Sequence, residues 1–136
     1  MNIVIIAADF HKEITEDMIH AAQDELKVLG IPTGDVIKVA GCYEIPLIME
    51  RQLSRENIEG AIALGFIEKG ETQHGEVMGY VVSKILVELQ LKHNKPIGMG
   101  IIGPGATEDQ AHARKERIAK GAARALVRNQ TLIRKK

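Results

Sequence analysis

The feature that most constrains the fold is the alternation of short, β-branched apolar runs with longer stretches of helical period. The apolar runs are typical of buried strands and cover residues 3–7, 36–39, 60–64 and 96–102. The intervening stretches predict helices at residues 14–29, 44–52, 72–93 and from 107 onward. Strands that are each followed by a helix pair in parallel and are covered by helices on both faces. We therefore expect an α/β fold: a single domain over residues 1–136 with three layers (αβα) and a doubly wound, four-stranded parallel sheet.

Local signals mark two of the helix ends. Gly30-Ile31-Pro32 ends the first helix, because glycine and then proline commonly follow a helix C-terminus. Thr107 and Gln110 form a capping box that starts the last helix, and Glu108 and Asp109 place two acids in its first turn.

The composition gives no indication of nucleic-acid or membrane binding. Lys and Arg total 18, as do Asp and Glu, so the chain has no basic surplus for phosphate backbones. No apolar run approaches the roughly 20 residues of a membrane-spanning helix, and the first strand begins without a charged leader. Cys42 is the only cysteine, which suits a reducing compartment. We expect a cytoplasmic protein.

The residues with chemical potential gather in the loops that follow the four predicted strands. These loops cover residues 8–11, 40–44, 66–74 and 103–106. In a parallel sheet they meet at the carboxyl edge of the strands, where ligands of such folds bind. The sequence therefore predicts a site at this edge.

The segment from Gly65 to Gly75 is the most informative of these loops. It ends a strand, offers Gly70 and a capping Thr72, and places His74 just inside the next helix. Unpaired N–H groups at a helix N-terminus bind phosphate readily, and an imidazole beside that phosphate can act as a general acid or base. The segment predicts an enzyme that handles a phosphorylated substrate.

Four motifs in these loops, taken together, resemble the lumazine synthase family. They are Asp9-Phe10-His11 with Ile14-Thr15, residues 39–46, Gly70-Glu71-Thr72-Gln73-His74, and residues 103–107 with Gln110, Ala111 and Arg114. The last motif is similar to the archaeal-type branch. The resemblance implies a flavodoxin-like fold and a transferase that needs no cofactor. It would condense 5-amino-6-ribitylaminopyrimidinedione with 3,4-dihydroxy-2-butanone 4-phosphate to 6,7-dimethyl-8-ribityllumazine, releasing phosphate and water in riboflavin biosynthesis.

The resemblance also implies a role for each site residue. His74 would be the general acid/base, and the phosphate would be bound by Gly70, Glu71, Thr72 and Arg114. The other substrate contacts would come from Phe10, Gly41, Cys42, Tyr43, Glu44, Phe66, Ile67, Glu68, Met99 and Lys120. Among these, Phe10 would stack on the pyrimidinedione and Glu44 would accept hydrogen bonds from the ribityl hydroxyls. No histidine or cysteine spacing indicates a metal site.

Two of these assignments stay open, and four positions depart from the family pattern. For Tyr43, a role in substrate binding and a purely structural role are almost equally supported, and Arg117 and Arg124 compete with Lys120. His11 stands where the family usually has asparagine, and Ala40 where it has proline. Glu68 replaces a usually apolar residue, and Met99 replaces phenylalanine or leucine. An unpaired carboxylate in a pocket is costly. The candidate partners of Glu68 are therefore Lys69 and a substrate N–H.

Three other functions compete with lumazine synthesis. A non-catalytic relative that binds lumazine or flavin, or only assembles, is favoured by Glu68. An enzyme that makes riboflavin itself fits the Gly-Glu-Thr-x-His motif less well. A generic phosphate or nucleotide binder would need a glycine-rich loop after the first strand, where Ala8-Asp9-Phe10 stands.

The resemblance further implies an assembly. It predicts small-molecule substrates and a homo-oligomer, a pentamer or a multiple of it, with active sites at the subunit interfaces. A single pentamer, a decamer and a hollow sixty-subunit shell all remain open.

Overall fold

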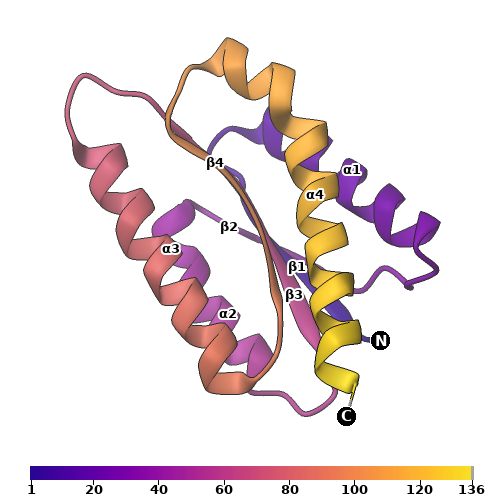
Figure 1. The fold of residues 1–136 in the computed structure, drawn as a ribbon. Helices are drawn as coiled ribbons and strands as arrows, with labels where there is room; N and C mark the ends of the chain where they lie inside the picture. The colour runs from indigo at the N-terminus through magenta and orange to yellow at the C-terminus, as the bar shows by residue number, and fades with distance from the viewer. Residues whose placement is uncertain (136) are drawn as a thin grey trace.

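The computed structural model describes residues 1–135 and contains a four-stranded parallel sheet with helices on both faces (Figure 1). The strands, in the spatial order β2-β1-β3-β4, are β1 (Ile3–Ala8), β2 (Val36–Val39), β3 (Gly60–Glu68) and β4 (Ile97–Ala106). The helices are α1 (Lys12–Val28), the short 3-10 helix η1 (Cys42–Glu44), α2 (Ile45–Leu53), α3 (His74–His93) and α4 (Glu108–Arg134). The predicted three-layer α/β fold with a parallel, doubly wound sheet is confirmed. Among residues 1–135, no helix combines the length and the apolar character needed to cross a membrane.

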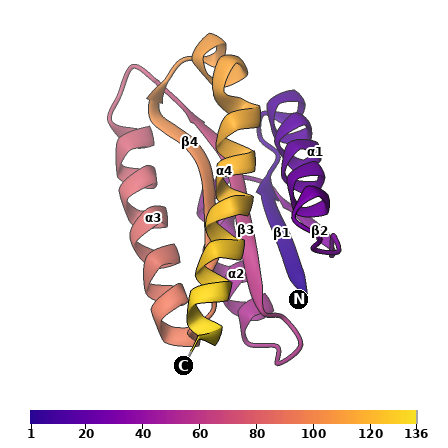
Figure 2. The same ribbon diagram turned by 45° about the vertical axis from the view of Figure 1, so that its right-hand side comes forward.

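The sheet separates two hydrophobic cores. Helices α1 and α4 cover one face and α2 and α3 cover the other, as the second view shows (Figure 2). Strand β1 lies inside the sheet and contributes to both cores, because successive side chains of a strand point to opposite faces. Its odd-numbered residues 3–7 pack with α1 and α4, and its even-numbered residues 4–8 pack with α2 and α3. Burial on both faces explains why this strand is an unbroken apolar run in the sequence.

Strand β4 and helix α4 approach closely because two strand glycines carry no side chain. A Cβ atom on Gly98 would lie 2.3 Å from the carbonyl oxygen of Ala122, and one on Gly100 would lie 3.2 Å from Ala122 Cβ. At Gly98 the obstacle is backbone, which cannot rotate away as a side chain can. This contact sets the position of α4 on the sheet.

The predicted end of α1 and start of α4 are confirmed. Gly30 has a φ of +76°, and its N–H and that of Ile31 donate to carbonyl groups of the last turn of α1 at 3.0 and 2.9 Å. This pair of bonds is a Schellman C-cap. At α4, Thr107 Oγ1 accepts from the Gln110 N–H at 3.2 Å, and the Gln110 side chain accepts from the Thr107 N–H at 2.9 Å.

The N-terminus of α3 differs from the prediction. The helix begins at His74 with Gln73 as its N-cap residue, so the expectation that the helix starts at Thr72 is wrong. Thr72 stays in the preceding loop, where its Oγ1 accepts a long hydrogen bond of 3.4 Å from the His74 N–H. His74 is therefore the first residue of the helix.

Strands β3 and β4 continue past their predicted ends. They pair as far as Glu68 and Ala106, with an irregularity between Phe66 and Glu68, and the Lys69 N–H donates to the Ala106 carbonyl at 2.7 Å. The sequence conceals this extension because residues 103–105 are glycine and proline, which are typical of loops. Strand β1 pairs with β3 only to residue 64, so the end of β3 projects beyond β1 and leaves space beside it.

Candidate active site

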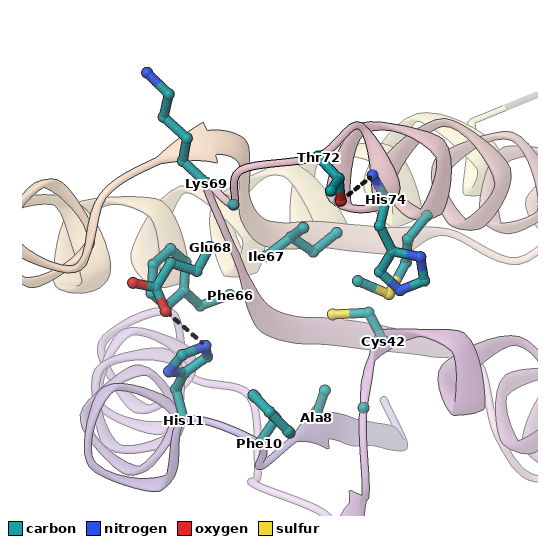
Figure 3. Close-up of a pocket in the computed structure, with 14 residues that line it drawn as sticks. Ala8, Phe10, His11, Cys42, Phe66, Ile67, Glu68, Lys69, Thr72 and His74 are labelled. Carbon is teal, nitrogen blue, oxygen red and sulfur yellow. Dashed lines mark hydrogen bonds and ion pairs between the residues drawn. The ribbon is translucent and has the colours of Figure 1, made fainter.

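A cavity of about 440 Å³ lies at the carboxyl edge of the sheet, among the loops that follow β1, β2 and β3. This is the switch point of the sheet, because the chain leaves β1 for β2 on one side and returns to β3 on the other. Figure 3 shows the lining residues, which are Ala8, Phe10, His11, Gly41, Cys42, Phe66, Ile67, Glu68, Lys69, Gly70, Thr72, His74, Gly75 and Met78. The cavity occupies the edge at which the sequence predicts a site.

His74 stands at the N-terminus of α3, on the same side of the cavity as Cys42 (Figure 3). It is exposed to solvent, and the centroid of its ring lies 6.0 Å from that of Tyr43, with the two planes at 67°. An imidazole that is accessible from a cavity can accept a proton from a bound ligand or donate one to it.

The loop before α3 offers unpaired backbone donors beside His74. Within residues 1–135, the N–H groups of Gly70, Glu71 and Thr72 donate to no backbone carbonyl. The first N–H groups of a helix also lack intrahelical partners, and α3 adds the positive end of its dipole to the same region. These donors together can bind an anion.

Aromatic and aliphatic side chains form the rest of the cavity wall. Phe66 and Ile67 are buried, but Phe10 is 79% exposed. Phe10 is therefore not part of the hydrophobic core. An aromatic ring that is held at a strand end and left open to solvent can stack on a flat ligand.

His11 and Glu68 face each other on one side of the cavity, and Cys42 lies on the opposite side (Figure 3). His11 Nε2 lies 3.7 Å from Glu68 Oε1, and the imidazole packs against the ring of Phe66 with the centroids 4.6 Å apart. The Lys69 side chain points away from the cavity. Of the two partners that the sequence offers for Glu68, Lys69 is therefore not used, and the side chain that lies beside Glu68 is that of His11.

Cys42 forms part of the wall and is not an activated nucleophile. Burial raises the pKa of its thiol to about 11, and the negative charge of Glu44 adds to the shift. The thiolate is the reactive form of cysteine, so the reactivity of this thiol is low. Within residues 1–135, no group of three or more His, Cys, Asp and Glu side chains is placed to hold a metal ion.

Comparison of the sequence with known proteins identifies its family. The family model of 6,7-dimethyl-8-ribityllumazine synthase matches residues 1–134. The chain belongs to this family. It is 40% identical over 124 residues to the 6,7-dimethyl-8-ribityllumazine synthase of Metallosphaera sedula, and the aligned region covers 91% of this chain and 82% of the relative. The enzyme of the same name from Staphylothermus marinus is 38% identical over 91% of this chain and 83% of the relative. The enzyme of that name from Pyrobaculum arsenaticum is 33% identical over 94% of this chain and 85% of the relative.

Most residues that the lumazine synthase resemblance implicates lie in or beside the cavity. Nine of them line it: Phe10, Gly41, Cys42, Phe66, Ile67, Glu68, Gly70, Thr72 and His74. Three more stand at its margin. Glu71 does not line the cavity but lies in the loop between two residues that do, Gly70 and Thr72. Tyr43 is next to His74, and Glu44 Oε1 lies 3.1 Å from the point where a side chain on Gly41 would begin.

Three residues that the lumazine synthase resemblance implicates lie outside this cavity. Arg114 lines a separate hollow formed by residues 103–106 and the start of α4, and its Nη1 donates to the Gln110 carbonyl at 3.2 Å. Lys120 lies farther along α4 and lines neither hollow. Met99 is half-buried against the core under α2 and α3. A single chain therefore does not bring Arg114 to the side of the cavity that holds His74.

Several lining residues were not predicted as site residues from the sequence. They are Ala8, His11, Lys69, Gly75 and Met78. Met78 follows His74 by one helical turn, and that spacing could have placed it beside the imidazole. His11 was noted only as a departure from the lumazine synthase pattern, because its partner Glu68 lies far away in the sequence.

Proposed function

We propose that this chain condenses 5-amino-6-ribitylaminopyrimidinedione with 3,4-dihydroxy-2-butanone 4-phosphate, yielding 6,7-dimethyl-8-ribityllumazine, phosphate and water. The observation that carries the proposal is the cavity in which His74 stands beside unpaired backbone donors. Membership of the lumazine synthase family supports the same reaction.

The residues of the cavity suit each step of this condensation. The 5-amino group attacks the ketone, and loss of one water gives an imine. His74 removes a proton from the carbon next to the imine, and phosphate leaves from the neighbouring carbon; the protonated His74 assists this departure. The resulting enol becomes a ketone, the ribityl-bearing nitrogen attacks it, and loss of a second water closes the ring.

The phosphate fits the loop before α3. We assign its oxygens to the N–H groups of Gly70, Glu71 and Thr72, which have no backbone acceptor within residues 1–135. Unpaired N–H groups and the positive end of a helix dipole stabilise the dianion that leaves. This placement keeps the departing phosphate beside His74, where proton transfer is needed.

We further propose a homo-oligomer, a pentamer or a multiple of it, in which a neighbouring subunit completes each site. Arg114 lies in a hollow separate from that of His74, so a second copy has to supply the guanidinium. Helix α3 also has an exposed apolar row that a neighbour would cover. The row consists of Val77, Tyr80, Val81, Val87 and Leu91.

The function is tested by mixing purified protein with both substrates and following lumazine absorbance. His74→Ala is expected to lower kcat by ~10²–10⁴-fold, which is the usual contribution of a general acid/base. His20→Ala, which removes an exposed imidazole from α1, serves as the matched control and is expected to keep full activity. Product formation no faster than the spontaneous reaction would overturn the proposal.

A non-catalytic relative that binds lumazine or flavin is the second candidate. The carboxylate of Glu68 in the cavity favours it, because a negative charge there could oppose the phosphorylated substrate. Tight lumazine or riboflavin binding without turnover would support this alternative.

A further inference from the structure

His11 and Glu68 form a polar pair that the phosphate chemistry does not use. The imidazole of His11 is held between two aromatic rings, with centroids 5.1 Å from Phe10 and 4.6 Å from Phe66. The side chain of His11 is 20% exposed and that of Glu68 is 45% exposed. Their ends are thus close to the cavity yet reachable by a ligand.

The pair retains hydrogen-bonding capacity for a ligand. The 3.7 Å between His11 Nε2 and Glu68 Oε1 exceeds hydrogen-bond distance. The carboxylate of Glu68 and the imidazole of His11 thus lie side by side without a hydrogen bond between them. A polar group in a pocket is stabilised when a ligand supplies its missing partner.

We propose that His11 and Glu68 recognise the imide edge of the pyrimidinedione ring and thereby set the specificity of the site for that ring. The inference rests on the proposed function. The imide edge presents one N–H between two carbonyl oxygens. Glu68 accepts a hydrogen bond from the ring N–H, and the N–H of His11 donates to a neighbouring carbonyl.

The position of the pair favours the ring over the other parts of the two substrates. A flat ring that stacks on exposed Phe10 has its edge beside His11, the next residue in the chain. Thr72 and His74 lie on the other side of the cavity (Figure 3), where the proposed phosphate site is. The carboxylate of Glu68 would repel a phosphate, but it strengthens a hydrogen bond from a neutral N–H.

The test compares two pyrimidinediones in wild-type and variant proteins. One is the substrate; the other carries a methyl group on the ring nitrogen between the two carbonyls. Because hydrogen bonds to charged groups are worth ~1.5–3 kcal/mol, methylation is expected to raise the wild-type KM for the pyrimidinedione by roughly 10- to 100-fold. In Glu68→Ile, which cannot accept the hydrogen bond, the KM is expected to rise for the substrate and to change little on methylation.

Two variants at His11 test the donor. His11→Leu is expected to raise the KM for the pyrimidinedione about tenfold or more, and His11→Asn, which restores a donor, is expected to recover most of the loss. The KM for the ketose phosphate is expected to stay constant in both. The matched controls are Glu13→Gln and His20→Asn, which remove an exposed carboxylate and an exposed imidazole from α1 outside the cavity.

A binding measurement separates this inference from the proposed function. A 5-nitro analogue of the pyrimidinedione lacks the amine and cannot condense, so its dissociation constant reports recognition alone. Weaker binding by Glu68→Ile and His11→Leu would support the inference even if the wild type made no lumazine. Turnover in the wild type with unchanged KM and binding in both variants would overturn the inference and leave the function standing. Weaker binding by the variants without any effect of methylation would also overturn it, because the pair would then contact the ribityl chain.

Discussion

At the residue scale, Cys42 shows how burial controls chemistry inside an open site. The thiol lines the cavity, but desolvation and Glu44 raise its pKa to about 11. We predict that iodoacetamide alkylates Cys42 at pH 7.5 roughly a hundredfold more slowly than an exposed thiol, because the thiolate is the reacting form. Ala40→Cys combined with Cys42→Ser provides the exposed comparison, since residue 40 is exposed.

Mass spectrometry of timed samples measures both alkylation rates. Wild-type protein is expected to retain activity after treatment, and its alkylation is expected to accelerate as the pH rises toward the thiol pKa. Equal alkylation rates at pH 7.5 would contradict the assignment of Cys42 as an unreactive wall residue.

Residue types at strand ends could be predicted from the sequence, but contacts between distant residues could not. The loop pattern predicts Phe10 and His74 as neighbours of one cavity, and both line it. The pairing of His11 with Glu68 depends on the parallel register of β1 and β3. That register is a long-range property, and the local sequence around either residue does not contain it.

At the element scale, the packing of α4 on β4 leads to a prediction about stability. Gly98→Ala is expected to lower the free energy of unfolding by about 1–3 kcal/mol, because its Cβ atom would meet the Ala122 carbonyl at 2.3 Å. Gly121→Ala is the matched control in α4, where a Cβ atom meets nothing within 4 Å. It is expected to raise stability by roughly 0.5–1 kcal/mol. Urea unfolding at fixed protein concentration measures both, and an unchanged midpoint for Gly98→Ala would contradict the packing argument.

A second element-scale prediction concerns the link between α2 and α3. Glu50 Oε2 lies 2.6 Å from His93 Nε2 and its Oε1 lies 2.5 Å from Lys92 Nζ. The hydrogen bonds from His93 and then Lys92 lower the pKa of Glu50 below 4.5. The unfolded chain therefore binds a proton at Glu50 more readily than the folded chain. The stabilisation is present above the unfolded value and is lost as the pH falls through the folded pKa.

The measurement compares the urea unfolding midpoints of wild type and Glu50→Gln from pH 7 to pH 3. The wild type is expected to be the more stable at pH 7, and the difference is expected to shrink below about pH 4.5. Glu88→Gln, which removes an exposed partner of Lys84, is the control and is expected to show little difference at any pH. A constant difference for Glu50→Gln across the range would contradict the role of its charge.

Element order and type followed from the sequence more fully than element ends. Hydrophobic period and β-branched runs predict the sheet and its four long helices, and the structure confirms them. The ends of β3 and β4 were missed because their last pair, Glu68 with Ala106, comes after residues 103–105, whose glycines and proline have no strand pattern. The late start of α3 follows from the same extension, since the loop begins farther along the chain.

At the scale of the whole molecule, the separation of His74 from Arg114 predicts complementation between inactive subunits. His74→Ala and Arg114→Ala proteins are each expected to lose activity, while oligomers reassembled from a mixture are expected to regain part of it. Activity returns because some sites combine an intact His74 from one subunit with an intact Arg114 from its neighbour. The assay follows lumazine formation after joint unfolding and refolding.

Separately refolded proteins that are mixed afterwards serve as the control and are expected to stay inactive while subunits do not exchange. If joint refolding restored nothing, Arg114 would act within its own subunit or not at all. Light scattering on the same samples reports whether an assembly formed, and so distinguishes failed assembly from failed complementation.

Helix α3 has His74 at its first residue and the exposed apolar row along its outer side. In the proposed assembly, the surface that holds neighbours together is thus continuous with the group that moves protons. Dilution that separates the subunits would then remove the guanidinium from every cavity at the same time. The rate of product formation per subunit would rise with total protein concentration, because mass action favours assembly. Doubling the amount of this protein in a cell would therefore more than double the rate of product formation.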